Sequence, residues 1–88
     1  MIELLNILVV DDDASLRDAI GMILESAGHR VELAASGPEA LSALEKGRFN
    51  LVMSDLWMDP MDGLTLLSQS RARAAELPAI LMTACGDG

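Results

Sequence analysis

Aspartate residues follow two separate apolar segments of the 88-residue chain. Residues 7–10 are apolar and lead directly into Asp11 and Asp12, and the mainly apolar residues 51–54 lead into Asp55. Short runs of this kind are typical of buried parallel strands. In an open α/β sheet, ligands bind at the carboxyl ends of the strands. We therefore expect the three carboxylates to lie close together at that edge.

Carboxylates gathered in one cleft repel each other, and this raises the pKa of some of them unless a cation neutralises the cluster. Mg²⁺ suits such a site because it prefers hard oxygen ligands and keeps several of its waters. The three aspartates therefore predict a Mg²⁺ site. The next residue, Asp13, is expected to cap the N-terminus of the following helix instead.

Helical and strand patterns alternate along the chain between and after these aspartates. The first helix is predicted by apolar residues at helical spacing, which are Leu16, Ile20, Ile23, Leu24 and Ala27, and Gly28 ends it. Further strands are expected at 31–33 and 79–82, and further helices at 36–46 and from Gly63 to the alanines at 72–75. The order β-α-β-α-β-α-β predicts an α/β fold with a doubly wound parallel sheet.

Composition and charge exclude several classes of protein. The chain is 51% hydrophobic, which favours one folded domain over disorder. A net charge of -8 and a pI near 4.2 argue against direct binding to nucleic acid or to an anionic membrane. No uncharged run reaches transmembrane length, and residues 1–6 do not form a signal peptide. The single cysteine, Cys85, cannot form an internal disulfide, so we expect a cytoplasmic protein.

Three motifs, in this order, resemble those of the response-regulator receiver domain of two-component signalling. They are the acidic pair Asp11-Asp12, the pattern Asp55-x-x-Met58 followed by Met61-Asp62-Gly63, and the pair Thr83-Ala84. The resemblance spans nearly the whole chain and implies a flavodoxin-like receiver fold with strand order 2-1-3-4 for the four strands present. Residues 77–84 are most similar to receivers of the nitrogen-regulation class, which control sigma-54 transcription activators.

The resemblance also implies the chemistry of the site. Asp55 would accept a phosphoryl group from a histidine kinase and form an acyl phosphate. Asp11, Asp12 and Asp55 would ligate Mg²⁺, and Trp57 would add its backbone carbonyl. The protein would then be a signalling module and not an enzyme in the usual sense.

Two further residues complete the site that the resemblance implies. The hydroxyl of Thr83 would move toward the phosphoryl group, and the backbone N–H of Ala84 would help to hold it. This change would be relayed to an output domain of DNA-binding or sigma-54 activator type.

Two features depart from the family pattern. Asp59 stands where the family usually has a proline directly after the loop methionine, and Pro60 follows it. The family pattern also continues with a helix, a fifth strand ending in a lysine, and a last helix, which these 88 residues do not include. The only lysine, Lys46, is expected at the opposite end of the sheet from Asp55. We therefore expect this chain to be phosphorylated poorly.

Other interpretations of the chain remain open. One alternative is a receiver fragment without signalling competence, which would serve only in binding or assembly. Separately, the uncharged strand at 79–82 is expected at an open edge of the sheet, where it would favour self-association. A haloacid-dehalogenase-like phosphatase would use Asp11-x-Asp13-x-Ser15, but that interpretation leaves Asp55 unexplained.

Arg17 is interpreted as part of a solvated helix face, and His29 as a turn residue with no other role.

Overall fold

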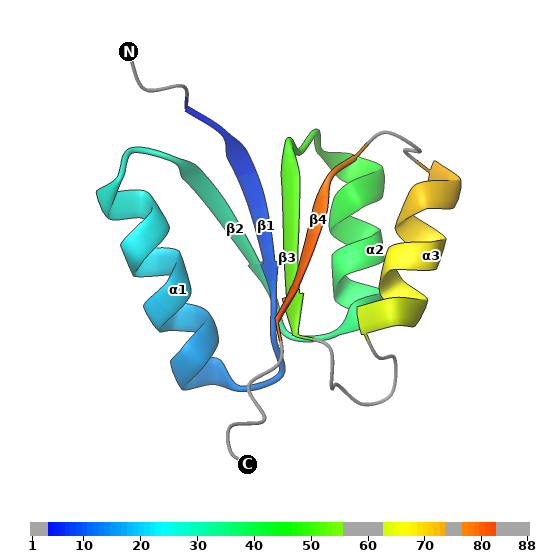
Figure 1. The fold of residues 1–88 in the computed structure, drawn as a ribbon, viewed down its shortest axis with the longest axis horizontal. Helices are drawn as coiled ribbons and strands as arrows, with labels where there is room; N and C mark the ends of the chain where they lie inside the picture. The colour runs from blue at the N-terminus through cyan, green and yellow to red at the C-terminus, as the bar shows by residue number, and fades with distance from the viewer. Residues whose placement is uncertain (1–3, 56–62, 74–76, 83–88) are drawn as a thin grey trace.

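The computed structural model describes residues 4–55, 63–73 and 77–82, in which strands and helices alternate (Figure 1). All four strands are parallel, and their order across the sheet is β2-β1-β3-β4. The predicted fold is therefore confirmed, with element ends shifted by one or two residues. The elements are β1 (Asn6–Val10), α1 (Ala14–Ser26), β2 (Arg30–Ala34), α2 (Gly37–Lys46), β3 (Leu51–Asp55), α3 (Gly63–Arg73) and β4 (Ala79–Met82).

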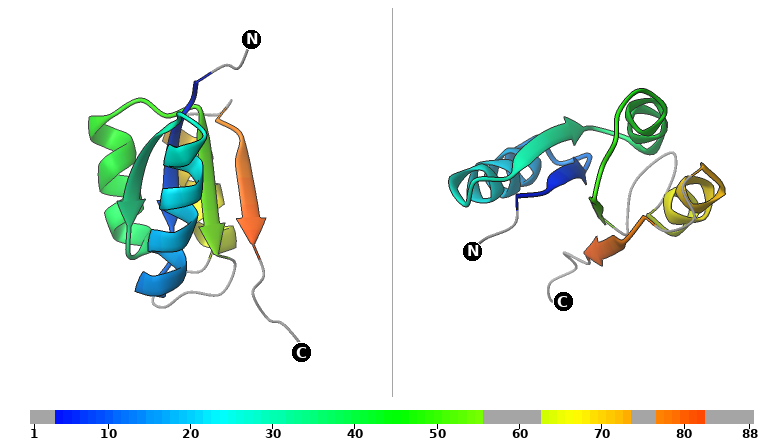
Figure 2. Two further views of the ribbon diagram at one scale, coloured as in Figure 1. Left: turned by 90° about the vertical axis from the view of Figure 1, so that its left-hand side faces the viewer. Right: turned by 90° about the horizontal axis from the view of Figure 1, so that it is seen from above.

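Helices lie on both faces of the sheet, with α1 on one side and α2 and α3 on the other (Figure 2). Side chains alternate between the two faces of a strand, so Leu8 and Val10 of β1 face α2 and α3, whereas Ile7 and Val9 face α1. The main core fills the α2 and α3 side. It consists of Leu8, Val10, Ala34, Ala40, Leu41, Val52, Leu66 and Leu77.

Side chains fix both ends of α1. The Asp13 carboxylate caps its start, as predicted, and accepts hydrogen bonds from the backbone N–H groups of Ser15 (3.0 Å) and Leu16 (3.2 Å). Gly28 follows the helix with a φ of 99°, a conformation that favours glycine. The interpretation of His29 as a simple turn residue is wrong, because its Nδ1 accepts a hydrogen bond from the N–H of Leu5 at 3.1 Å.

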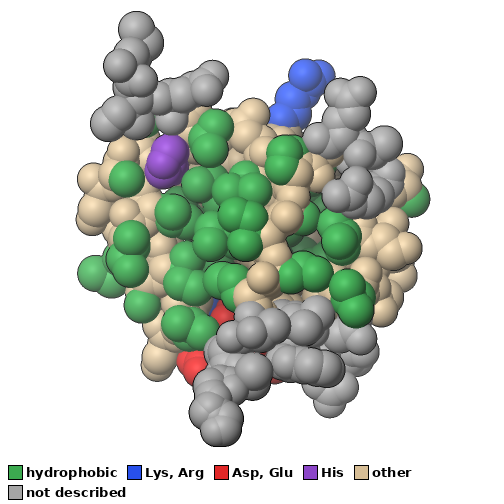
Figure 3. Space-filling model, viewed as in Figure 1, with side chains coloured by type: hydrophobic (Ala, Val, Ile, Leu, Met, Phe, Trp, Pro, Cys, Tyr) green, Lys and Arg blue, Asp and Glu red, His purple; other side chains and the backbone are tan. Residues whose placement is uncertain are grey.

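The apolar face of the sheet on the α1 side is only partly covered (Figure 3). Val9, Met53 and Ile80 form one row across β1, β3 and β4 on this face. Burial decreases along the row: Val9 is 0% exposed, Met53 is partly buried, and Ile80 is 46% exposed. Within the described residues β4 also has a neighbouring strand on one side only. This edge therefore combines free backbone groups with an uncharged, partly exposed surface.

An edge of this kind can pair with a second copy of the chain. We expect the 88-residue protein to self-associate, and we expect Ile80→Lys to shift it toward monomer because the ammonium would be desolvated in a paired edge. Light scattering across protein and salt concentrations measures the effect, and added salt should favour association by screening the charge of -8.

Leu64→Lys is the matched control, since Leu64 is 58% exposed and belongs to α3, which lies on the opposite face of the sheet from Ile80. It should leave the association unchanged. A parent chain that stays monomeric at every concentration and unfolds cooperatively would show that the four-strand sheet is self-sufficient.

Candidate metal centre

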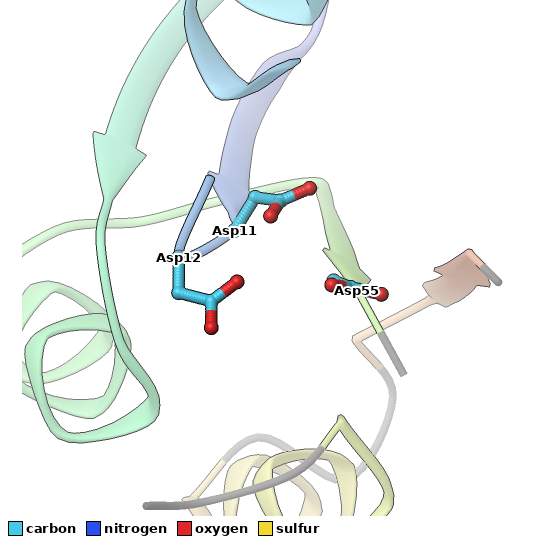
Figure 4. Close-up of side chains that lie close together, drawn as sticks. All are labelled: Asp11, Asp12 and Asp55. Atoms are coloured by element: carbon cyan, nitrogen blue, oxygen red, sulfur yellow. The ribbon is translucent and has the colours of Figure 1, made fainter. Parts of the chain in front are cut away.

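Three carboxylates meet at the carboxyl end of the central strands (Figure 4). Asp11 and Asp12 follow β1, and Asp55 is the last residue of β3. Val10 lies opposite Ser54 in the register of these two strands, so the residues that follow them are brought side by side. One carboxylate oxygen from each of the three aspartates lies within 4.8 Å of the other two. Asp11 and Asp55 are buried, whereas Asp12 is exposed, so the cluster has a closed side and an open side.

Asp11 is held by hydrogen bonds at three separate groups. Its backbone N–H donates to the carbonyl of Ala34 at 3.1 Å, which ties it to the end of β2. Its Oδ1 accepts from the N–H of Asp13 at 2.9 Å, and its carbonyl accepts from Nη1 of Arg17 at 3.0 Å. These contacts fix both the backbone and the side-chain direction of a residue that is 1% exposed.

Arg17 was not predicted to contact the site, and the interpretation of it as a solvated helix residue is wrong. The side chain is partly buried and reaches from the first turns of α1 back to the loop after β1. Side chains on a helix point toward its N-terminus, so a long cation one turn after the capping residue can reach the preceding loop. That geometric rule was the only indication of this contact in the sequence.

The second oxygen of Asp11, Oδ2, is buried and has no hydrogen-bond partner among the described residues. Burial is the largest cause that raises the pKa of Asp11, and the carboxylates of Asp55, Asp12 and Asp13 raise it further. The hydrogen bond from the N–H of Asp13 acts in the opposite direction. A buried anionic oxygen without a partner, beside two more carboxylates, fits a small divalent cation with oxygen ligands.

Three residues that the sequence assigned to the site lie outside the described residues. They are Trp57, Thr83 and Ala84, and Asp59, the departure from the family pattern, is also outside them. Their predicted roles stay predictions. The helices in the described part of the chain are too short or too polar to span a bilayer.

Comparison with known proteins identifies similar sequences and structures. The family profile for the response regulator receiver domain matches residues 7–88. The transcriptional regulatory protein GlrR of Escherichia coli (strain K12) is 41% identical over 81 residues, which cover 92% of this chain and 18% of GlrR. The C4-dicarboxylate transport transcriptional regulatory protein DctD of Rhizobium meliloti (strain 1021) is 42% identical over 82 residues, covering 93% of this chain and 18% of DctD.

A solved structure is similar to the fold of the chain over most of its length. The response regulator protein TrrA of Thermotoga maritima, determined in complex with Mg²⁺-BeF, matches with a TM-score of 0.87 and 32% identity. The match covers 92% of this chain and 70% of the TrrA chain. The chain therefore corresponds to a small part of GlrR and DctD and to most of TrrA.

We expect Asp11→Asn to stabilise the metal-free chain at neutral pH by on the order of 1 kcal/mol, because it removes a buried charge from beside two other carboxylates. The amide keeps an oxygen for the N–H of Asp13 and supplies N–H groups in place of Oδ2. Thermal unfolding with and without Mg²⁺ tests this: Mg²⁺ should stabilise the parent and leave the variant unchanged.

The same substitution has a predicted pH signature. The raised pKa of Asp11 means that the native metal-free chain holds this proton to higher pH than the unfolded chain does. The free energy of unfolding therefore decreases as the pH rises from the unfolded pKa through the native pKa. Asp11→Asn should flatten that decrease. A parent chain whose stability increases with pH over that window would contradict the assigned burial of Asp11.

Arg17→Ala should lower the free energy of unfolding by about 1 kcal/mol or more, because it removes a charge-assisted hydrogen bond to the carbonyl of Asp11. Chemical denaturation of parent and variant measures the difference. Arg30→Ala is the control, because Arg30 is exposed and no described residue is bonded to its guanidinium. Equal stability of the two variants would show that the contact of Arg17 is energetically neutral.

Proposed function

The chain belongs to the response regulator receiver domain family, and from this premise we propose that it accepts a phosphoryl group on Asp55 from a histidine kinase. The observation that supports this most directly is the position of Asp55 at the end of β3, beside Asp11 and Asp12. A carboxylate at that position can attack an incoming phosphoryl group from the open side of the cluster, where Asp12 is exposed.

The proposed transfer needs no proton from Asp55. An ionised carboxylate oxygen of Asp55 attacks the phosphorus of the phosphohistidine, the phosphorus–nitrogen bond breaks, and the departing imidazole nitrogen takes up a proton from water. The product is an acyl phosphate. Such a transfer depends on in-line positioning and on neutralising charge more than on acid–base chemistry. The fixed backbone around Asp11 suits this requirement, because it keeps the neighbouring carboxylates from moving as charge accumulates.

We propose that Asp11, Asp12 and Asp55 hold Mg²⁺, with the backbone carbonyl of Trp57 as a further ligand. The unpartnered Oδ2 of Asp11 supports this assignment, and the similar TrrA was solved with Mg²⁺-BeF. When bound, the ion would neutralise negative charge on the transferred group.

The hydroxyl of Thr83 and the N–H of Ala84 are proposed to contact the phosphoryl group once it is on Asp55. Movement of these residues would carry the signal onward to an output domain.

The partners of the whole protein are also part of the proposal. GlrR and DctD are named transcriptional regulatory proteins, and this chain covers 18% of each. We propose that the chain acts in the cytoplasm as the receiving part of a transcription regulator with a DNA-binding or sigma-54 activator output. The chain itself would be a signalling module and not an enzyme in the usual sense. Its charge of -8 argues against direct contact with nucleic acid.

A haloacid-dehalogenase-like phosphatase is the less favoured alternative. That mechanism would need Asp13 as an acid/base, whereas Oδ1 of Asp13 accepts hydrogen bonds from the N–H groups of Ser15 and Leu16 and so caps α1. The alternative of a receiver fragment that only binds a partner predicts the same fold. It differs from the proposed function in predicting no phosphorylation of Asp55.

Incubation with acetyl phosphate and Mg²⁺ should add one acid-labile phosphoryl group, detected by intact mass. Asp55→Asn should abolish the addition, whereas Asp13→Asn should keep it because asparagine is also a good helix cap. A phosphoryl group that persists in Asp55→Asn would refute the assignment, and no addition to the parent would favour a role in binding alone.

The reaction of this chain is expected to be slow. Its one lysine, Lys46, ends α2, and the loop that follows leads to the start of β3. A strand of five residues places Asp55 about 17 Å away at the other end. No lysine of the chain therefore reaches the phosphoryl group, so a charge-assisted contact of about 1.5–3 kcal/mol is missing. Efficient formation of a long-lived acyl phosphate would contradict this expectation.

A further inference from the structure

Figure 1 shows α1 beside β2, which is the edge strand opposite β4. A groove lies between this helix and this strand. Its volume is about 310 Å³, and it is separate from the carboxylate cluster because it contains none of the three aspartates. One side of the groove is formed by residues of α1, and the other by the face of β2 that carries Val31 and Leu33. The residues that line it are Asp18, Gly21, Met22, Glu25, Val31 and Leu33.

The floor of the groove is apolar and open to solvent. Gly21 is buried and has no side chain, and a Cβ atom at that position would lie 3.1 Å from Cδ2 of Leu33. The absent side chain therefore lets α1 and β2 approach each other closely, with Leu33 against the backbone of Gly21. Met22 beside it is 68% exposed and Leu33 is 41% exposed. An occupant would remove this apolar surface from water.

The helix side of the groove is acidic. Asp18 and Glu25 are seven residues apart on α1, which places both on the stripe that contains Gly21, about 10.5 Å from each other along the helix axis. Both are exposed, and none of the described lining residues is basic. A second copy of this acidic chain is therefore disfavoured here, and a cationic partner is favoured.

The strand side of the groove has free backbone groups. β2 has β1 as its only neighbouring strand in the described sheet. The N–H of Arg30 donates to Leu5 and the carbonyl of Ala34 accepts from Asp11, so these two residues point their backbone groups toward β1. Backbone direction alternates along a strand, and the N–H and carbonyl groups of Val31 and Leu33 therefore point to the open edge. The same two residues line the groove with their side chains.

We propose that this groove binds an extended, cationic segment of a partner protein, which adds to the sheet as a strand beside β2. Peptide recognition by strand addition draws affinity from the main chain and specificity from alternate side chains. Two lysines four residues apart on an added strand lie about 13 Å from each other, with an apolar residue midway on the same face. Their flexible side chains can reach Asp18 and Glu25 while the apolar residue covers the exposed surface of Met22 and Leu33.

This inference does not depend on phosphorylation of Asp55, and pairing through β4 would leave the groove accessible. The probe is a synthetic peptide with blocked ends, Thr-Lys-Thr-Val-Thr-Lys-Thr, titrated into the isotope-labelled 88-residue chain. The amide resonances of Val31 and Leu33 should shift and their hydrogen exchange should slow, since their N–H groups gain partners. The double variant Asp18→Lys with Glu25→Lys should weaken binding by about tenfold or more.

Glu32→Lys is the matched control, because Glu32 is exposed on β2 but its side chain lies on the opposite face from Val31 and Leu33. It should change the affinity by less than about twofold. A peptide with glutamates in place of the lysines, and one with serine in place of the valine, should both bind at least about tenfold more weakly. Equal binding of the glutamate peptide, equal loss in both protein variants, or shifts confined to residues outside α1 and β2 would overturn the proposal.

Discussion

A carboxylate buried at the end of the central strand is the constraint on which the rest of this structure depends. β1 has neighbours on both sides, and its residues from Ile7 to Val10 are buried, so the chain can leave the sheet only through Asp11, which is 1% exposed. Burying a carboxylate is unfavourable unless its oxygens have partners. The contacts to Asp13, Arg17 and Ala34 satisfy its backbone and one oxygen only. The other oxygen, Oδ2, has no partner among the described residues, and this destabilises the metal-free protein. A bound cation would remove this destabilisation, so the folded protein would gain stability on binding it.

Strand order turns this single buried charge into a site. β1 and β3 are neighbours although a whole strand–helix unit separates them in sequence, and the pair Val10 and Ser54 sets their ends level. A sheet in simple sequential order would place β2 between them and separate Asp55 from Asp11 by the width of a strand, about 4.8 Å more. The doubly wound topology therefore brings the carboxylates close enough to repel each other. It also leaves the cluster open to solvent at Asp12, where a cation could enter and neutralise them.

Periodicity in the sequence predicted every described element, because each depends on local pattern. The resemblance to receiver domains implied the strand order, and the positions of the aspartates at strand ends predicted their clustering. Periodicity did not predict which residues are exposed, because exposure depends on how distant parts of the chain cover each element. The apolar stripe from which α1 was predicted includes Leu16 and Ile23, yet these are 37% and 68% exposed. The residue of α1 that is buried is Gly21, which carries no hydrophobic signal. The contact between His29 and Leu5 joins residues 24 positions apart, and no local pattern encodes it.

The two edge strands of the described sheet, β2 and β4, differ in how far their charges restrict pairing with another chain. β2 carries Arg30 and Glu32 on one face and lies under the acidic stripe of α1 on the other. The acidic side chains repel an acidic strand, and an uncharged strand would remove them from water without compensation. A cationic strand can still pair at this edge, so its protection is selective. β4 has no charged residue, and nothing in its sequence discriminates between partners. An uncharged edge favours any apolar strand that can reach it, whether from the same protein or another. We therefore propose two separate roles for the acidic residues of this chain: at the ends of β1 and β3 they would hold a cation, and along α1 they would select the strand that the sheet can accept.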